Sequence, residues 1–461
     1  MQGTADARRR FNLALLVALL VAIMLGSSTT IFNDGDVSWH IATGQWILAH
    51  RTLPHADPFS FTWAGKPWVP IEWLAEVLMA AVYGIARYSG IAALVTAALM
   101  ALHAIVFLNA ARFVRPWIAV GAVVAMDLVL IPMMLARPHV LAWPLIAFWT
   151  WLMLRAREQD RAPPLAAALL MVVWANLHGS FVMGLAIAAA FALEALVASP
   201  DRPRAVRQWA LFGVACLVAI FINANGVGGV LHPLRIANLA MLPLIDEWKP
   251  SSPAITPVFF VILAAAIALL WLKRPKLLAV RWLLLGALLI LALLQVRHQA
   301  VLAIVTAMIL PTGFAREREP VAATMRWLVA GAVALVVAIR AVLPITLPEN
   351  ETNPWRLIAA VPPQLRSQPV LNGYAMGGPL ILSGIRPYVD GRGDMYGDQL
   401  VVDYKRITDG DAASLNAAVR RWNIRWAILP RRYKKLVALL DRSPGWRRIR
   451  EDEAGLIYVR A

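Results

Sequence analysis

Two aspartates, Asp34 and Asp36, stand immediately after the first long apolar run of the chain, and His40 follows one helical turn later. A carboxylate just outside a membrane can act as a general base toward a hydroxyl group, or it can bind a divalent cation through its oxygens. An aspartate here can also cap the helix that we expect over 38–50. Capping accounts for only one of the two aspartates, so the pair beside His40 predicts chemistry at this place.

A third carboxylate, Glu72, begins the next apolar stretch, 72–87. The N-terminus of a helix stabilises negative charge, so Glu72 has a structural explanation as well as a catalytic one. We include Glu72 with Asp34 and Asp36 as a candidate catalytic residue.

Short turns between later apolar runs carry polar and basic side chains, namely Arg137, His139, Asn176, His178, Arg297 and His298. Ionisable residues at membrane depth are costly and usually face a cavity or an ion pair. Arginine binds phosphate through paired hydrogen bonds, and histidine adds a donor whose charge follows pH. We therefore expect these residues, together with His40, to bind an anionic group of a substrate. Mutual pairing with carboxylates for packing is the alternative.

The other motifs carry less information. The histidines show no HExxH spacing and stand beside arginines, so we expect no zinc site. The single cysteine, Cys216, provides neither a disulfide framework nor a thiolate metal site. In YVDGRGDMYGD (388–398), Asp390 and Arg392 are either turn residues or substrate contacts, and the residues favour neither reading.

The composition indicates the class of protein that must position these residues. Of 461 residues, 60% are hydrophobic and 15% are charged, whereas soluble domains are about 45–50% apolar and about 25% charged. The apolar residues form repeated runs long enough to cross a hydrocarbon core of about 30 Å as helices. The fold class predicted is a polytopic α-helical membrane protein. Its net charge of +17 fits cytoplasmic loops facing anionic membrane lipids, so we expect no nucleic-acid partner.

The topology follows from the distribution of Lys and Arg. Arg8, Arg9 and Arg10 hold the N-terminus in the cytoplasm. If 72–87 lies along the outer surface instead of crossing, every later basic cluster falls inside: Arg112/Arg115, Arg155–Arg161, Arg202–Arg207, Lys273–Lys276 and Arg316–Arg318. About eleven transmembrane helices result, near 11–28, 91–110, 117–135, 140–154, 163–177, 180–198, 208–224, 256–272, 279–295, 299–313 and 324–344.

The chain therefore divides into two parts. Residues 1–345 form a transmembrane module that includes an external loop, 29–90, with two surface helices. Residues 346–461 form an external α/β domain, because apolar runs shorten there and strand and helix signals alternate. Expected strands are PVLNGY, GPLILSG, RPYVDG and IRWAILP, expected helices are DQLVVDYKRI, DAASLNAAVRRW and KKLVALLD, and WRRIREDEAGLIYVR is the expected closing hairpin.

These features together resemble the GT-C superfamily of integral membrane glycosyltransferases. The motif likeness lies in DGDVSWHIATGQWIL, HADPFSFTWAGKPWVPIEWLAE and YVDGRGDMY, which are similar to a group of bacterial multi-pass proteins of that architecture. The resemblance implies a polyprenyl-phosphate-linked sugar as donor, Asp34 or Asp36 as catalytic base, and Arg137, His178 and Arg297 on the side of the lipid phosphate. It also implies the bacterial inner membrane, with a periplasmic C-terminal domain.

The expected reaction is inverting transfer of the sugar to a glycan, lipid or protein acceptor in the envelope. A divalent cation, Mg²⁺ or Mn²⁺, is compatible with the carboxylates and is not required by them. The chain lacks the WWDxG-type signature of oligosaccharyltransferases, which argues against asparagine-linked transfer. Three alternatives stay open: a ligase or polymerase of lipid-linked glycans, a non-catalytic envelope assembly protein, and a transporter.

Overall fold

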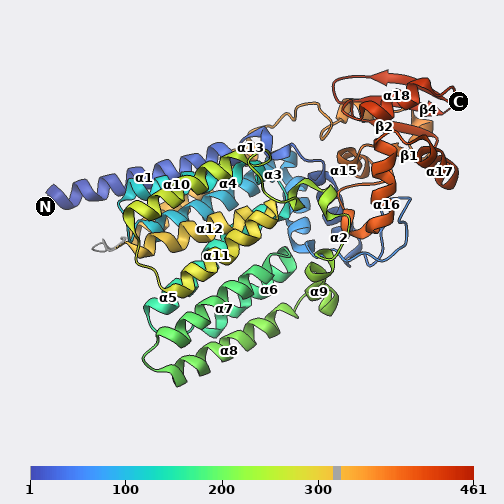
Figure 1. Cartoon of the computed structure of the whole chain (residues 1–461). Coiled ribbons are helices and arrows are strands. Elements are labelled where there is room, and N and C mark those ends of the chain that lie inside the picture. Colours follow the sequence, from blue (N-terminus) through green and yellow to red (C-terminus); the bar gives the residue numbers. More distant parts are fainter. Residues whose placement is uncertain (1, 315–322, 461) are drawn as a thin grey trace.

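The computed structural model describes residues 2–314 and 323–460. A bundle of long helices occupies most of the chain, and a small α/β domain sits at one end of it (Figure 1). Helix α1 starts at the opposite end of the bundle and runs toward the α/β domain (Figure 1). The core of the bundle is one continuous apolar cluster that draws residues from α1, α3 and most of the later helices.

Each of the eleven ranges expected to cross the membrane contains a helix. These helices are α1 (Gln2–Gly26), α3 (Trp73–Ala110), α4 (Pro116–Leu130), α5 (Pro138–Glu158), α6 (Leu169–Leu177), α7 (Phe181–Ala198), α8 (Arg202–Ile220), α10 (Pro257–Lys273), α11 (Ala279–Leu294), α12 (Gln299–Ile309) and α13 (Ala323–Val342). Within the described residues, six segments are long and apolar enough to cross a membrane: 8–26, 73–110, 116–133, 181–198, 202–220 and 296–313. The protein is thus helical with several candidate spans, and the number eleven stays a prediction.

Helix α3 is bent sharply at Ala86 and Arg87. Both residues leave helical φ/ψ values, and Arg87 has φ 52°. A Cβ atom on Gly90 would overlap the carbonyl oxygen of Val82, so the chain folds back closely at this point. Residues 73–85 and 88–110 are therefore two helical pieces that meet at a turn. The break lies at the end of 72–87, the range in which the sequence predicts the second surface helix.

The basic clusters gather at the end of the bundle where α1 begins. Arg112 after α3 binds Glu158 at the end of α5, with a nitrogen–oxygen distance of 2.6 Å. The backbone N–H of Ala162 donates to Gln208 of α8, and that of Lys276 donates to Gly313. The turns from α7 to α8 and from α10 to α11 lie at this same end (Figure 1). The expected cluster Arg316–Arg318 lies outside the described residues.

The C-terminal domain contains a four-stranded sheet in the order β1-β2-β4-β3. Strand β1 pairs with β2 in parallel, and β4 pairs antiparallel with both β2 and β3. The elements are α14 (Trp355–Ala359), β1 (Val370–Asn372), α15 (Gly377–Leu382), α16 (Gly393–Thr408), α17 (Ala412–Trp422), β2 (Trp426–Leu429), α18 (Lys434–Arg442), β3 (Trp446–Glu451) and β4 (Leu456–Arg460).

Two of the expected strands are wrong. GPLILSG forms helix α15, and its residues 377–381 are buried, so the apolar run had no period that could distinguish a strand from a buried helix. RPYVDG is irregular rather than a strand. The strands expected in PVLNGY and IRWAILP, the three helices and the closing hairpin are confirmed.

The loop 29–90 is packed against the C-terminal domain. Trp39 and Ala42 of α2 (Asp36–His50) and Trp68 belong to the same apolar cluster as the core residues of that domain. Thr62 Oγ1 donates to the carbonyl of Tyr388 at 2.6 Å, and Arg386 donates to the carbonyl of Ser60 at 3.0 Å. The loop and the domain therefore form one structure at the end of the bundle.

Candidate functional site

Arg137 is the centre of an ion-pair group at this end of the bundle. Its guanidinium lies 3.1 Å from Asp34 Oδ2, 3.4 Å from Asp36 Oδ2 and 3.3 Å from Glu247 Oε1. Asp34 and Asp36 precede and begin α2, Arg137 precedes α5, and Glu247 belongs to the short helix η5 (Asp246–Trp248). Segments more than a hundred residues apart in the sequence thus contribute to one charged group.

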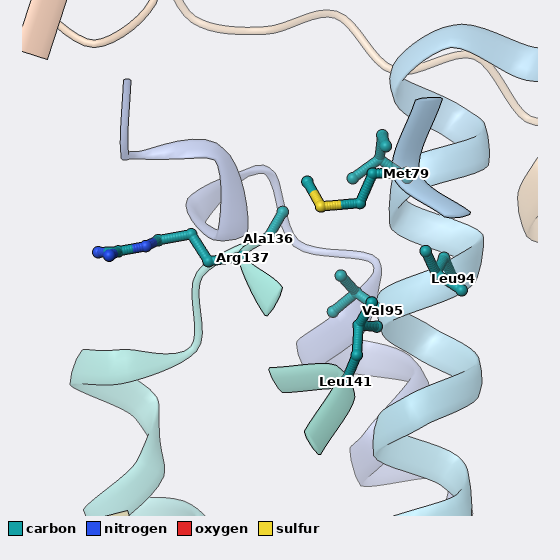
Figure 2. Close-up of a pocket in the computed structure, with 7 residues that line it drawn as sticks. Met79, Leu94, Val95, Ala136, Arg137 and Leu141 are labelled. Carbon is teal, nitrogen blue, oxygen red and sulfur yellow. The ribbon is translucent and has the colours of Figure 1, made fainter. Parts of the chain in front are cut away.

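Local structure explains why Arg137 points toward the carboxylates. Pro138 begins α5, which leaves Arg137 extended at the N-cap position. The N–H of Ala136 donates to the carbonyl of Ile31 and ties this turn to the end of α1. Figure 2 shows the arginine extending away from a narrow apolar gap lined by Met79, Leu94, Val95 and Leu141. Its aliphatic stem packs on apolar residues while the charge reaches the carboxylates.

The charges in this group shift one another's pKa. Burial, helped by neighbouring Asp34, raises the pKa of Asp36 to about 8, against the opposing effect of Arg137. The attraction of Arg137 lowers the pKa of Glu247 to about 2. At neutral pH, Glu247 is therefore ionised while Asp36 holds a proton for much of the time. Asp34 Oδ1 also accepts the N–H of Asp36 at 2.9 Å, whereas Gly35 is the N-cap residue of α2, so neither aspartate holds the N-cap position considered from the sequence.

Glu72 connects this group to two histidines. Its Oε1 lies 3.3 Å from His178 Nε2 and its Oε2 lies 3.9 Å from His40 Nε2. Burial raises the pKa of Glu72 to about 7, against the attraction of Arg137 and Arg297. Burial also lowers the pKa of His178 well below its usual value, and that of His139 to about 4. Both imidazoles are neutral at pH 7, so they act as hydrogen-bonding groups rather than as cations.

The guanidinium group of Arg297 makes contacts different from those of Arg137. It belongs to the short helix η6 (Val296–His298), and its guanidinium lies 4.1 Å from the ring centroid of Trp248. Among the described residues no carboxylate comes within ion-pair distance of it, although the charge of Arg297 contributes to the pKa of Glu72 and Glu247. Arg297 is thus a cation beside the ion-pair group, and its guanidinium makes no hydrogen bond to any other residue of 2–314 and 323–460.

The remaining expected site residues have other surroundings. Asn176 makes hydrogen bonds to Trp73 Nε1 and to the backbone of Val172, Ile222 and Ala224, so it holds helices together. His139 Nε2 donates to the carbonyl of Met133 at 2.7 Å, and its ring lies 6.4 Å from that of His178. His298 is partly buried on η6, next to Arg297.

Asp390 and Arg392 form a buried network instead of lining the group around Arg137. Arg392 binds Asp390 through two nitrogens at 2.7 and 2.8 Å, and it binds Asp57 of the external loop at 2.7 Å. Tyr396 also donates to Asp390, at 2.6 Å. Because these side chains are almost fully buried, they hold the loop to the domain.

The turn that contains this network covers the aspartates directly. A Cβ atom on Gly391 would overlap Asp36 Oδ1, and one on Gly35 would overlap the carbonyl oxygen of Ala375. Only glycine permits this approach at either position. The DGD and YVDGRGD motifs therefore pack against each other, with Asp36 between the bundle and the C-terminal domain.

Several residues of the site were not among those expected from the sequence. Glu247 pairs with Arg137, Glu76 lies 3.2 Å from His40, and Trp248 lies against Arg297, because segments distant in the chain come together. No group of three or more His, Cys, Asp or Glu in 2–314 and 323–460 is arranged to hold a metal ion. No protein-family model matches the chain, and no curated protein matches it significantly.

Proposed function

We propose that this protein is a membrane glycosyltransferase of GT-C type. It would transfer a sugar from a polyprenyl-phosphate-linked donor to an acceptor in the cell envelope, with inversion at the sugar carbon. The observation that carries the proposal is the convergence of Asp34, Asp36, Arg137 and Arg297 at one end of the helical bundle, below an α/β domain.

The position of the group suits a donor with a lipid tail. The bundle exposes large apolar side chains on α8, α10 and α11, as expected for helices that face lipid. A polyprenyl chain could stay among lipids while its phosphate reaches the bundle end. Arg297, with its free donors, is the residue best placed to bind that phosphate, because charge-assisted hydrogen bonds from arginine suit phosphate oxygens.

The accompanying topology has about eleven spans, with the basic loops in the cytoplasm and the C-terminal domain in the periplasm. The gathering of the described basic clusters at the end where α1 begins supports this orientation. The carboxylate group would then face the periplasm, where the acceptor is found.

A lipid-linked glycan ligase or polymerase is the second candidate, and one observation favours it. Both aspartates are engaged by Arg137, so neither is a free base in this arrangement. A ligase would use the arginines and histidines without needing an aspartate.

Transfer from a radiolabelled polyprenyl-phosphate sugar, in membranes that contain each variant, separates the two candidates. The glycosyltransferase proposal expects that replacement of the general base, by Asp34→Asn, Asp36→Asn or Glu72→Gln, lowers the transfer rate by roughly 10²–10⁴-fold, the usual contribution of such a group. The exposed Asp409→Asn is the matched control and should retain full activity. Full activity in all three site variants would favour the ligase.

A further inference from the structure

Four side chains form a line that runs from the site into the bundle, in the order His178, Glu72, His40 and Glu76. The distance from His178 Nε2 to Glu72 Oε1 is 3.3 Å, that from Glu72 Oε2 to His40 Nε2 is 3.9 Å, and that from His40 Nδ1 to Glu76 Oε1 is 3.2 Å. Imidazole and carboxyl groups alternate along this line. Each imidazole has one nitrogen toward Glu72.

The inner half of the line is buried and incompletely hydrogen-bonded. The side chains of His40 and Glu76 are each 1% exposed. His40 Nε2 and Glu76 Oε2 make no hydrogen bond to any described residue. An ionised carboxylate in such surroundings is costly, and a proton on Glu76 removes that cost.

The charge balance of the site also requires retained protons. Five carboxyl groups lie in the site with two arginines: Asp34, Asp36, Glu72, Glu76 and Glu247 with Arg137 and Arg297. Full ionisation would leave a net charge of about −3 in a largely buried region, which is strongly unfavourable.

The charged and titratable groups that face the two glutamates come from several elements. Those around Glu72 are His40, His178, Arg137, Arg297, Glu247 and Asp394. Those around Glu76 are His40, Glu72 and Arg392. The arginines limit how many protons the site retains, and the mutual repulsion of the carboxylates prevents both glutamates from ionising together.

We propose that Glu72 and Glu76 share one proton through His40, and that Glu72 is the carboxyl group that exchanges protons with the substrate. In one state the proton is on Glu76 and is donated to His40 Nδ1, while Nε2–H faces an ionised Glu72. In the other state Glu72 is protonated toward Nε2, and Nδ1–H donates to an ionised Glu76. Two protons shift along the line and one is transferred in net terms. A small rotation of Glu72, which is 23% exposed, closes the 3.9 Å distance.

The consequence for the reaction rests on the proposed function, whereas the shared proton is a property of this chain alone. With the proton on Glu76, Glu72 accepts the hydroxyl proton of the acceptor. The acceptor oxygen forms its bond to the sugar, and the bond to the lipid phosphate breaks with its electron pair on the phosphate oxygen. Asp34 and Asp36, held by Arg137, then position the site instead of taking the proton.

Infrared spectroscopy of the purified full-length protein in lipid nanodiscs tests the shared proton, because the carbonyl stretch of a protonated carboxyl is separate from that of a carboxylate. At about pH 8, above the usual range of a glutamate, we expect Glu76→Gln to contain one protonated carboxyl fewer than the wild-type protein. Glu453→Gln, an exposed position, is the matched control and should leave the spectrum unchanged.

Coupling through His40 is tested with Glu72→Gln, a variant at a partly exposed side chain. It should shift the Glu76 band, which is identified as the band lost in Glu76→Gln, in the wild-type background and leave it in place in a His40→Gln background. Equal band areas in wild type and Glu76→Gln would overturn the proposal, and so would an unshifted band in Glu72→Gln. A protein with the shared proton but no transfer activity would refute only the proposed function.

Discussion

Replacement of Arg392 by leucine should detach the external loop from the C-terminal domain. Arg392 forms buried ion pairs with Asp57 and Asp390, and all three side chains are at most 1% exposed. Its guanidinium also lies 4.7 Å from the ring centroid of Trp68 and 5.2 Å from that of Phe59. Leucine would leave two carboxylates buried without a cation.

The magnitude follows from these contacts. Removal of one partner from a buried ion pair costs about 3–5 kcal/mol, chiefly because the remaining charge is left uncompensated. Loss of the stacking on the two rings adds to this cost. Since 1.4 kcal/mol corresponds to a factor of ten, opening of the loop should become roughly 10²–10³-fold more frequent.

Hydrogen–deuterium exchange over 55–68 and 388–392 measures this opening. The protected amides include those of Asp57 and Trp68, which donate to backbone carbonyls within the loop, and that of Phe61, which donates to Pro387. Arg406→Leu is the matched control, because Arg406 is 61% exposed and its ion pair with Asp403 is 3.6 Å long. Such a pair contributes at most about 1 kcal/mol.

Similar exchange rates in Arg392→Leu and the control would refute this prediction. If Arg392→Leu exchanges at these amides within a few-fold of the control, the buried network does not hold the loop to the domain. Asp57→Asn combined with Arg392→Leu should exchange more slowly than Arg392→Leu alone, because one uncompensated charge is removed.

Two further predictions concern Asp36. A methyl group in Gly391→Ala would overlap Asp36 Oδ1, so this variant should lose about 1–3 kcal/mol of stability in thermal unfolding. Gly445→Ala, with nothing within 4 Å of the added methyl group, should lose less than about 1 kcal/mol. Because folding raises the pKa of Asp36 from 3.8 to about 8, its effect on the free energy of unfolding is most favourable at low pH and is lost as pH rises through that interval. Asp36→Asn should therefore gain stability relative to wild type between about pH 5 and about pH 8 in thermal-shift measurements, and a pH-independent difference would contradict the assigned burial.

The helices were largely predictable from the sequence, because long apolar runs and flanking Lys and Arg mark their positions. The range 72–87 predicted from the charge distribution ends at the bend of α3, whereas its placement along the membrane surface stays a prediction. GPLILSG was not predictable, because a short apolar run fits a buried helix as well as a strand.

The site was predictable as a set of residue types but not as a set of contacts. Asp34, Arg137 and Arg297 stood out because charges at the ends of apolar runs are costly. No short-range signal indicated that Glu247 would pair with Arg137, which is 110 residues away in the chain. Nor did any signal indicate that Arg392 would be part of a buried network with Asp57 and Asp390. The close approach of Gly391 to Asp36 became evident only with the three-dimensional structure.

Binding of undecaprenyl phosphate to the purified protein in nanodiscs tests the central claim most directly, because it requires no knowledge of the sugar or acceptor. We predict that native mass spectrometry detects the bound lipid on the wild-type protein. Arg297→Gln should weaken binding by roughly 10–100-fold, since hydrogen bonds to a charged group contribute about 1.5–3 kcal/mol, while Arg406→Gln should bind as the wild type does. Equal retention of the lipid by Arg297→Gln and wild type, or no retention by either, would contradict the account.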